Sequence, residues 1–287
     1  MIRTHEAIAH AKLNLTLRVV GKRADGLHLL DSLTVFTDFG DRVRVTTHQQ
    51  RDYIEVFGPF ASGIDGDNIV SKALDRYRSL TETPGGLAIE IEKNIPVAAG
   101  LGGGSCDVGA VLRILQELVH KPLSDRALTT LAMSIGADVP VCFFAQPARM
   151  RGIGEVLSPI GLVPPCPLVL VNPGVPVSAG RVFQAFRGPF SGPIELPANL
   201  SNQALLLGHI GAEPHNDLIA TAATLAPAVS DVLTFLSGFP EVKSAGMSGS
   251  GATCFGVISA VDNGKISSVV EGARERGWWA TTTKLRQ

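Results

Sequence analysis

The sequence has few aromatic residues, with two Trp and two Tyr in 287 residues, and its formal net charge is −1. No run of Lys and Arg is interleaved with aromatic side chains, so the pattern typical of a nucleic-acid-binding surface is missing. The longest apolar stretches, such as residues 139–145, are much shorter than the roughly 20 residues that a membrane helix needs. The sequence therefore predicts neither a nucleic-acid partner nor a membrane span.

Cysteine is also scarce. The sequence has four, Cys106, Cys142, Cys166 and Cys254, and none forms a CxxC pair. They lie mostly in or beside apolar runs, which is typical of buried free thiols. The first six residues are not followed by the apolar segment of a signal peptide. Without an export signal or a disulfide framework, we expect a protein of the reducing cytoplasm.

Several common catalytic motifs are missing as well. HExxH, paired His and Cys ligands and GxSxG do not occur, so zinc hydrolysis and serine-nucleophile chemistry have no support and no metal ligands can be assigned. No Gly-Lys-Ser/Thr completes a Walker A loop, and the third glycine of the dinucleotide fingerprint would fall at Ser105. The two commonest phosphate-binding motifs are thereby excluded.

Alternating and helical periodicities are both present. Leu13, Leu15, Leu17 and Val19 point to one face of a predicted strand at residues 11–20. Further strands are predicted at 30–39, 42–47, 87–91, 141–145, 150–152, 168–171, 252–257 and 280–284. Helices are predicted at 67–80 (capped by Asp67 or Asn68), 105–120, 124–133, 179–186, 201–207, 215–222, 226–236 and 261–276. Because strands and helices do not alternate regularly, the sequence predicts an α+β fold of two lobes, with domains at 1–161 and 162–287.

A glycine-rich segment between a predicted strand and a predicted helix is the strongest functional signal. Glycines allow backbone N–H groups to approach a ligand closely, and a helix N-terminus favours an anion, so this segment can hold a phosphate chain. The alternative is a tight turn with glycine for geometry alone. The expected phosphate-binding residues are Pro96, Val97, Ala98, Ala99, Gly100, Leu101, Gly102, Gly103, Gly104, Ser105 and Cys106.

A second glycine cluster at residues 244–253 ends in a predicted strand. In isolation it is typical of a flexible turn. Together with the first glycine-rich segment, it is interpreted as a second wall around the same phosphates.

Phosphoryl transfer to an alcohol requires a base for the hydroxyl proton and a cation for the charge on the moving group. Asp138, in a polar turn before an apolar run, and Lys12, on the first strand, are the candidates. In isolation, Asp138 would be interpreted as a turn or cap residue and Lys12 as a solvated edge residue.

Three blocks, AKLNL at 11–15, PVAAGLGGGSCD at 96–107 and MSGSGATCF at 247–255, resemble the GHMP kinases in sequence and in order. This resemblance implies a ribosomal-protein-S5-like N-terminal lobe and a ferredoxin-like C-terminal lobe. It also implies a kinase that uses ATP with Mg²⁺, which residues 96–106 would bind. Asp138 would take the substrate proton, while Lys12 would keep Asp138 ionised and steady the phosphate.

GKRADGLH at 21–28, GADVPV at 136–141 and GIGE at 152–155 resemble a narrower branch of these kinases. That branch phosphorylates the 2-hydroxyl of 4-diphosphocytidyl-2-C-methyl-D-erythritol in the non-mevalonate route to isoprenoids. The resemblance implies that Asn14 and His28 face this substrate, with His28 against the cytosine.

The sequence departs from the family pattern at two positions. Leu27 replaces the usual Tyr that packs on the cytosine, so Phe183 or another ring would supply the stacking, or the base would be held by hydrogen bonds and apolar contacts. Cys106 replaces the family's usual serine, so a contact of that serine hydroxyl with phosphate or Mg²⁺ is not expected here.

Two alternatives stay open at this point. A GHMP kinase for homoserine or mevalonate is opposed by the segments at 21–28 and 136–141. A non-catalytic nucleotide-binding regulator is opposed by the presence of both Lys12 and Asp138. The sequence does not indicate an oligomeric state.

Overall fold

The computed structural model describes residues 2–47, 50–63, 68–83, 85–197, 199–211, 216–258 and 265–287. The chain forms two compact units, the first from residues 1–12, 40–97 and 102–145 and the second from 13–39, 98–101 and 146–287. Strands β1 (Thr4–Lys22) and β2 (His28–Thr46) each contribute to both units. Because the units are interleaved along the chain, they do not divide at one position, and the domain boundary at 161/162 stays a prediction.

In the first unit, the second half of β2 pairs antiparallel with β4 (Ala88–Glu92), which pairs in parallel with β3 (Tyr53–Phe57). Buried Val43 and Val45 alternate along β2 with exposed Arg42 and Arg44. This two-residue period gives the sheet one apolar face and one charged face.

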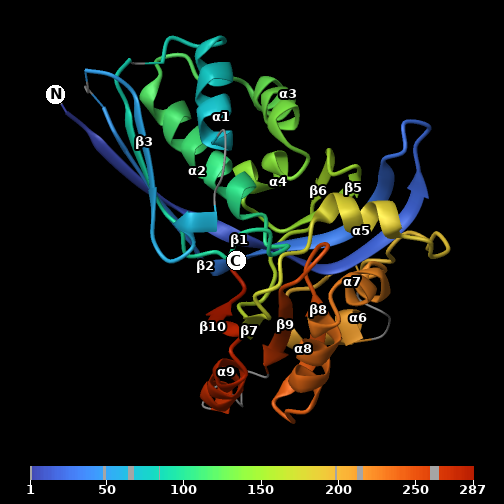
Figure 1. Ribbon diagram of the computed structural model, residues 1–287. Helices are drawn as coiled ribbons and strands as arrows, with labels where there is room; N and C mark the ends of the chain where they lie inside the picture. Colours follow the sequence, from blue (N-terminus) through green and yellow to red (C-terminus); the bar gives the residue numbers. More distant parts are fainter. Residues whose placement is uncertain are drawn as a thin grey trace. The chain divides into compact units, whose positions relative to one another are not determined.

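Helices α1 (Ile69–Arg78), α2 (Gly103–Leu118), α3 (Asp125–Ile135) and α4 (Val139–Phe144) complete the first unit. Helix α2 packs against α1 and α4, and α1 and α2 lie beside the strands (Figure 1). The side chain of Asn68 accepts a hydrogen bond from the Val70 N–H, which confirms the predicted N-cap of α1. Asp67, the alternative cap, lies outside the described residues.

The strand predicted at residues 141–145 is wrong, because this segment belongs to helix α4. A six-residue apolar run has no period that separates helix from strand. Two contacts with α2 accompany the helical form: Arg113 Nη1 donates to the carbonyls of Cys142 and Phe143, both at 2.8 Å. A Cβ on Gly109 would lie 2.5 Å from the Cys142 oxygen, so the two helices approach more closely than a side chain would allow.

The two strands predicted at 30–39 and 42–47 are one continuous strand, β2. Gly40 lies between the two predicted segments, and a Cβ there would lie 2.8 Å from the Ala9 carbonyl carbon, so the glycine accommodates the neighbouring strand. Three strands were not predicted: β3, β6 (Val156–Pro159) and β8 (Val242–Met247).

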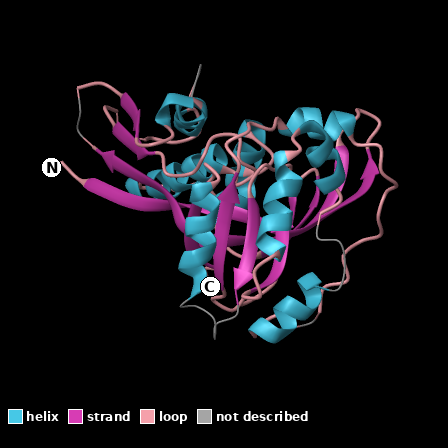
Figure 2. Cartoon of the chain, turned by 60° about the horizontal axis from the view of Figure 1, so that its bottom comes forward, coloured by secondary structure: helices cyan, strands magenta, loops and turns pink. Residues whose placement is uncertain are grey.

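The second unit contains a four-stranded antiparallel sheet in the order β10 (Trp279–Lys284), β7 (Pro167–Asn172), β9 (Cys254–Ile258) and β8. Helices α8 (Ala228–Ser237) and α9 (Ile266–Glu275) pack on this sheet (Figure 2). The unit also contains α5 (Ala179–Ala185), α6 (Gln203–Gly211), α7 (Ile219–Leu225) and the pairing of β2 with β5 (Ala148–Gly152) and of β5 with β6.

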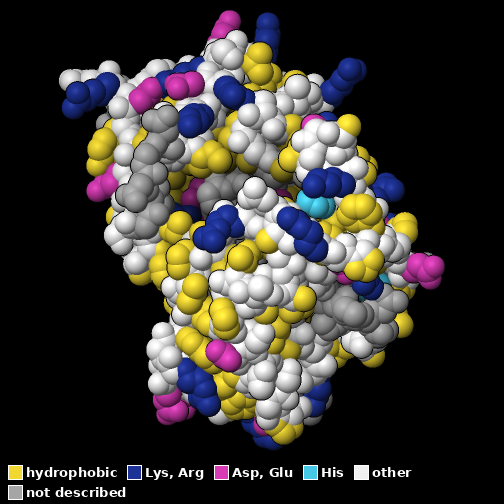
Figure 3. Space-filling model, turned by 45° about the vertical axis from the view of Figure 1, so that its right-hand side comes forward, with side chains coloured by type: hydrophobic (Ala, Val, Ile, Leu, Met, Phe, Trp, Pro, Cys, Tyr) yellow, Lys and Arg dark blue, Asp and Glu magenta, His cyan; other side chains and the backbone are white. Residues whose placement is uncertain are grey.

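The second unit's core draws on distant parts of the chain. Leu17, Val19 and Leu30 pack in one buried cluster with residues of β7, α7 and α8. On the surface, acidic and basic side chains both occur across the face in Figure 3, consistent with a formal net charge of −1. Among the described residues, no helix is long and apolar enough to span a bilayer.

Candidate active site

Lys12 and Asp138 form an ion pair in the first unit. The Lys12 Nζ lies 3.0 Å from Asp138 Oδ2, and the two side chains are 5% and 36% exposed. Strand β1 carries Lys12, whereas Asp138 is the N-cap residue of α4 but makes no side-chain capping bond. The carboxylate pairs with the ammonium instead, so the structure brings together the two residues predicted to act as base and cation.

The surroundings of Lys12 keep it charged. Burial by itself lowers the pKa of Lys12, but the Asp138 carboxylate raises it above its ordinary value. A permanent positive charge beside a partly exposed carboxylate can stabilise negative charge on a reacting phosphoryl group.

The start of α2 packs against Lys12. Gly102 has φ +67°, and a Cβ on it would lie 3.3 Å from Lys12 Cε and 3.7 Å from Cys106 Sγ. The Cys106 Sγ lies 3.2 Å from the Cys142 Sγ, and both residues are buried. Burial raises the pKa of Cys142 well above its ordinary value, so it stays a thiol. Cys106 packs beside the glycine-rich segment, close to Gly102.

A buried charged cluster lies beneath the same helix start. The Lys93 ammonium donates to side-chain oxygens of Asp41 and Asp107, the latter at 2.6 Å. The other Asp41 oxygen accepts from the backbone N–H groups of Asn94 at 2.6 Å and Ile95 at 2.7 Å. These bonds join β2, the residues that follow β4 and α2, and so fix the point where the glycine-rich segment enters its helix.

We expect Asp107→Asn to alter how stability depends on pH. Burial, and next the Asp41 carboxylate, raise the pKa of Asp107 to about 8, and its Oδ1 has no hydrogen-bond partner among the described residues. Between the ordinary carboxyl pKa and 8, the folded state keeps a proton that the unfolded state has lost, so this group reduces stability as pH rises.

Asp107→Asn removes that titration, so the variant should gain stability relative to the wild type as pH rises from about 4 to 8. Urea unfolding at several pH values measures the difference. A difference in unfolding free energy that stays constant over this range would contradict the expectation.

In the second unit, the two glycine clusters are in contact. Ser248 Oγ donates to the Gly100 carbonyl at 2.9 Å, and the Thr253 N–H donates to the Ala99 carbonyl at 3.1 Å. Ser248 Oγ also accepts from the Asn14 N–H at 3.1 Å. Residues 248–253, here named the second glycine loop, therefore support residues 98–101.

Asn14 is buried, with 1% of its surface exposed. Its Nδ2 donates to Ser32 Oγ at 2.7 Å and Thr34 Oγ1 at 3.2 Å, so the amide orientation is fixed by β2. The predicted contact of Asn14 with a substrate stays a prediction.

His28 lies among aromatic rings in the second unit. Its ring is stacked on Phe183, with centroids 5.6 Å apart at 25°, and meets Phe186 edge-on at 5.7 Å. Burial, and then the charge of Lys22, lower the pKa of His28, which favours the neutral imidazole. Leu27 is 48% exposed. The structure thus brings His28 and Phe183 together.

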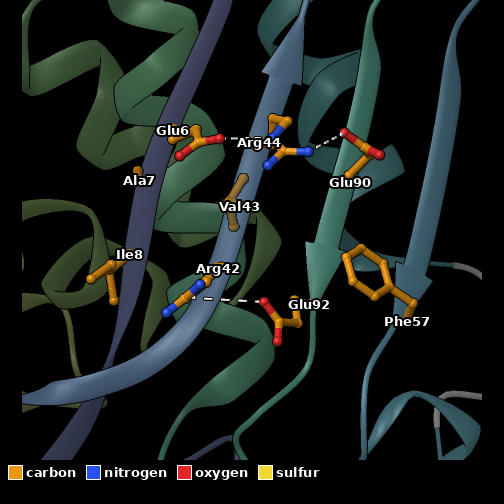
Figure 4. Close-up of a pocket in the computed structure, with 9 residues that line it drawn as sticks. All are labelled: Glu6, Ala7, Ile8, Arg42, Val43, Arg44, Phe57, Glu90 and Glu92. Atoms are coloured by element: carbon orange, nitrogen blue, oxygen red, sulfur yellow. Dashed lines mark hydrogen bonds and ion pairs between the residues drawn. The ribbon is translucent and has the colours of Figure 1, made fainter.

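A hollow of about 380 Å³ lies elsewhere, on the charged face of the first unit's sheet (Figure 4). Its rim carries the ion pairs Arg44–Glu6 at 2.8 Å, Arg44–Glu90 at 3.5 Å and Arg42–Glu92 at 3.9 Å. None of the predicted site residues lines it. Its charges neutralise one another across neighbouring strands, as expected for a solvated sheet face.

Comparison with known proteins decides the family. Residues 68–146 match the model of the GHMP kinases N terminal domain. The 4-diphosphocytidyl-2-C-methyl-D-erythritol kinase of Paramagnetospirillum magneticum is 44% identical over 278 residues, which cover 96% of this chain and 97% of that protein. The chain belongs to the 4-diphosphocytidyl-2-C-methyl-D-erythritol kinase family.

Solved structures agree with this family. A crystal structure of 4-(cytidine 5'-diphospho)-2C-methyl-D-erythritol kinase matches with a TM-score of 0.80 and 32% identity, covering 99% of this chain and 100% of that chain. A homoserine kinase from Cytophaga hutchinsonii matches with a TM-score of 0.69 at 17% identity, over 99% of this chain and 94% of that chain, and shows the fold alone.

Membership of the 4-diphosphocytidyl-2-C-methyl-D-erythritol kinase family confirms the predicted resemblance, the two-lobed α+β GHMP kinase fold and the activity as a small-molecule kinase. The homoserine-type, mevalonate-type and non-catalytic alternatives are not favoured. Sequence reasoning had missed Lys93 and Asp41 and had placed Ser248 only within the second glycine cluster, without its contact to Gly100. Each acts through contacts with residues far away in the chain, which leave no local pattern.

Proposed function

We propose that the protein transfers the γ-phosphoryl group of ATP to the 2-hydroxyl of 4-diphosphocytidyl-2-C-methyl-D-erythritol, in the cytoplasmic supply of isoprenoid precursors. The ion pair between Lys12 and Asp138 carries this proposal, because it joins a base and a fixed cation at 3.0 Å. The names of the near-full-length relatives support the choice of substrate.

In the proposed reaction, the 2-hydroxyl oxygen forms a bond to the γ-phosphorus while the bond to the β,γ-bridging oxygen breaks and ADP leaves. Asp138 accepts the hydroxyl proton. Lys12 holds Asp138 ionised and stabilises the negative charge of the phosphoryl group in transit. We propose direct in-line transfer, without a phosphorylated enzyme.

We propose that residues 96–106 bind the ATP phosphates. The segment contains glycines in left-handed conformations, Gly100 at φ +76° and Gly102 at φ +67°, and leads into the N-terminus of α2. Backbone N–H groups and the helix dipole suit an anion there.

Mg²⁺ would enter with the nucleotide. Within the described ranges, no three His, Cys, Asp or Glu side chains form a metal-binding group. This fits an ion that in kinases takes one or two carboxylates and completes its shell with phosphate oxygens and water. When bound, it would neutralise charge on the phosphates.

We propose that His28 and Phe183 form the cytosine side of the substrate site, with Asn14 facing the same substrate. The stacked pair supplies an aromatic surface although Leu27 stands where the family has Tyr. A neutral His28 can both donate and accept hydrogen bonds.

One assay tests the proposed substrate. ADP release is measured with the cytidyl substrate, homoserine and mevalonate under identical conditions. We expect turnover with the cytidyl compound alone. Faster turnover with homoserine or mevalonate would refute the substrate assignment, and no turnover with any of the three would refute kinase activity on these alcohols.

We expect Gly100→Ala to weaken ATP binding severely. A Cβ there would collide with the Ser248 carbonyl oxygen and lie 2.8 Å from that of Gly251, both in the second glycine loop. Gly174→Ala is a matched control, because Gly174 has the same φ of +76° and nothing within 4 Å of an added Cβ.

Both variants carry the strain of a left-handed alanine, about 1 kcal/mol. Only Gly100→Ala should also raise the KM for ATP, by about tenfold or more, since the loop must shift. Equal KM values in the two variants would contradict this role of residues 98–101.

A further inference from the structure

Asn216 is a buried amide, 3% exposed, that none of the steps above uses. Its Nδ2 donates to the carbonyl oxygens of Met247 at 2.9 Å and Gly249 at 2.7 Å. These two carbonyls flank Ser248. The Asn216 amide therefore donates to the second glycine loop, through Gly249, and to the residue that precedes the loop, Met247.

Asn216 is itself held firmly within the second unit. It forms a parallel bridge with Leu17 of β1, and the neighbouring Asp217 N–H donates to the Leu17 carbonyl at 3.0 Å. Asp217 Oδ2 accepts from the Val19 N–H at 2.8 Å. The Asn216 Oδ1 accepts from the Leu218 N–H at 2.9 Å, next to the start of α7. The amide is thus a rigid support.

The two carbonyl contacts determine the direction of the loop's peptide units. In a trans peptide, the C=O and the following N–H point in opposite directions. With the carbonyls of Met247 and Gly249 facing Asn216, the N–H groups of Ser248 and Ser250 face away from it. The Ser248 N–H meets the Thr253 carbonyl at 3.0 Å, which closes the loop.

The second glycine loop is in direct contact with residues 98–101 of the proposed ATP-binding segment. Ser248 lies between the two carbonyls that Asn216 holds, and its hydroxyl donates to Gly100 at 2.9 Å. A Cβ on Gly249, at φ +57°, would lie 3.1 Å from the Gly100 oxygen, so the backbones are closely apposed. A change in the peptide planes at 247–249 would displace residues 98–101.

We propose that Asn216 is a positioning residue for ATP binding: its amide holds the second glycine loop in the conformation that supports residues 98–101. This inference rests on the proposed binding of ATP by residues 96–106. Asn216 acts through the loop and need not touch the nucleotide.

Asn216→Asp tests the proposal selectively. The substitution keeps the oxygen that accepts from Leu218 but replaces the donor with a carboxylate oxygen facing two carbonyls. Asn202→Asp is the matched control. Asn202 is exposed, and its Oδ1 accepts from the Leu205 N–H at 2.9 Å in the first turn of α6.

Calorimetric titration of the full-length wild type and both variants with ATP and Mg²⁺, without the alcohol, measures the Kd directly. We expect Asn216→Asp to raise the Kd about tenfold at pH 8, since both hydrogen bonds are lost and replaced by repulsion. Asn202→Asp should match the wild type. Near pH 5 the introduced carboxyl gains a proton and can donate one hydrogen bond. The ratio of the variant's Kd for ATP to the wild-type Kd should therefore be smaller than at pH 8.

Thermal unfolding of each variant, measured in parallel at both pH values, separates positioning from general destabilisation. An unchanged Kd in Asn216→Asp, or a rise of equal size at pH 5 and pH 8, would overturn the proposal. If Asn216→Asp does not fold, Asn216→Ser keeps one donor without a charge and should give an intermediate Kd; a wild-type Kd would overturn the proposal equally. Failure of the wild type to bind ATP would instead refute the proposed function, and this inference with it.

Discussion

Asp138→Asn is expected to reduce kcat by about a thousandfold, with the KM for ATP nearly unchanged. The amide fills the same volume as the carboxylate, but it cannot take the hydroxyl proton. It also removes the negative charge that lies 3.0 Å from the Lys12 ammonium. The loss should fall on the chemical step, which single-turnover quenched-flow measurement isolates.

Asp125→Asn is the matched control for this substitution, because Asp125 is an exposed acid in the first turn of α3. It should keep wild-type kcat and lose only the few tenths of a kcal/mol that a helix-dipole interaction contributes. Turnover near the wild-type rate in Asp138→Asn would refute the assignment of Asp138 as the base.

Lys12→Met is expected to lower kcat by about a hundredfold, because a fixed cation at the developing charge is lost. The Lys12 side chain is 5% exposed, and methionine replaces its apolar part with one of similar length. Asp138 is 36% exposed, so water can hydrate its carboxylate in the variant. The fold should therefore persist.

The double variant sharpens this prediction. If Lys12 acts through Asp138 and on the same charge, combining Lys12→Met with Asp138→Asn should cost little more than the larger single loss. Lys243→Met, which removes an exposed lysine on β8, should leave kcat unchanged. Fully multiplicative losses in the double variant would show that the two residues act independently.

Local patterns predicted the elements that carry the site. The alternation around Lys12 indicated a strand, Asn68 indicated a helix start, and the glycines of residues 100–104 indicated a turn into a helix; the structure has each of these. In these segments, backbone preference and burial favour the same conformation, so the local sequence is sufficient to predict the secondary structure.

The remaining features depend on contacts between distant residues. Helix α4 was predicted as a strand because its short apolar run fits either conformation. The helix is in contact with Arg113 and Gly109 of α2, which lie about 30 positions earlier in the chain. The bonds of Lys93 to Asp41 and of Asn216 to the second glycine loop join residues that no local period connects.

The sharing of β1 and β2 between the two units affects how the protein can be made. The second unit's buried cluster includes Leu17, Val19 and Leu30, which leave the ribosome long before Ala273 and Ala280 of the same cluster. The apolar side chains of these early strands stay exposed to solvent until almost the whole chain has been synthesised. The order of translation therefore exposes strand surface for longest near the N-terminus, where binding by a chaperone would be most valuable.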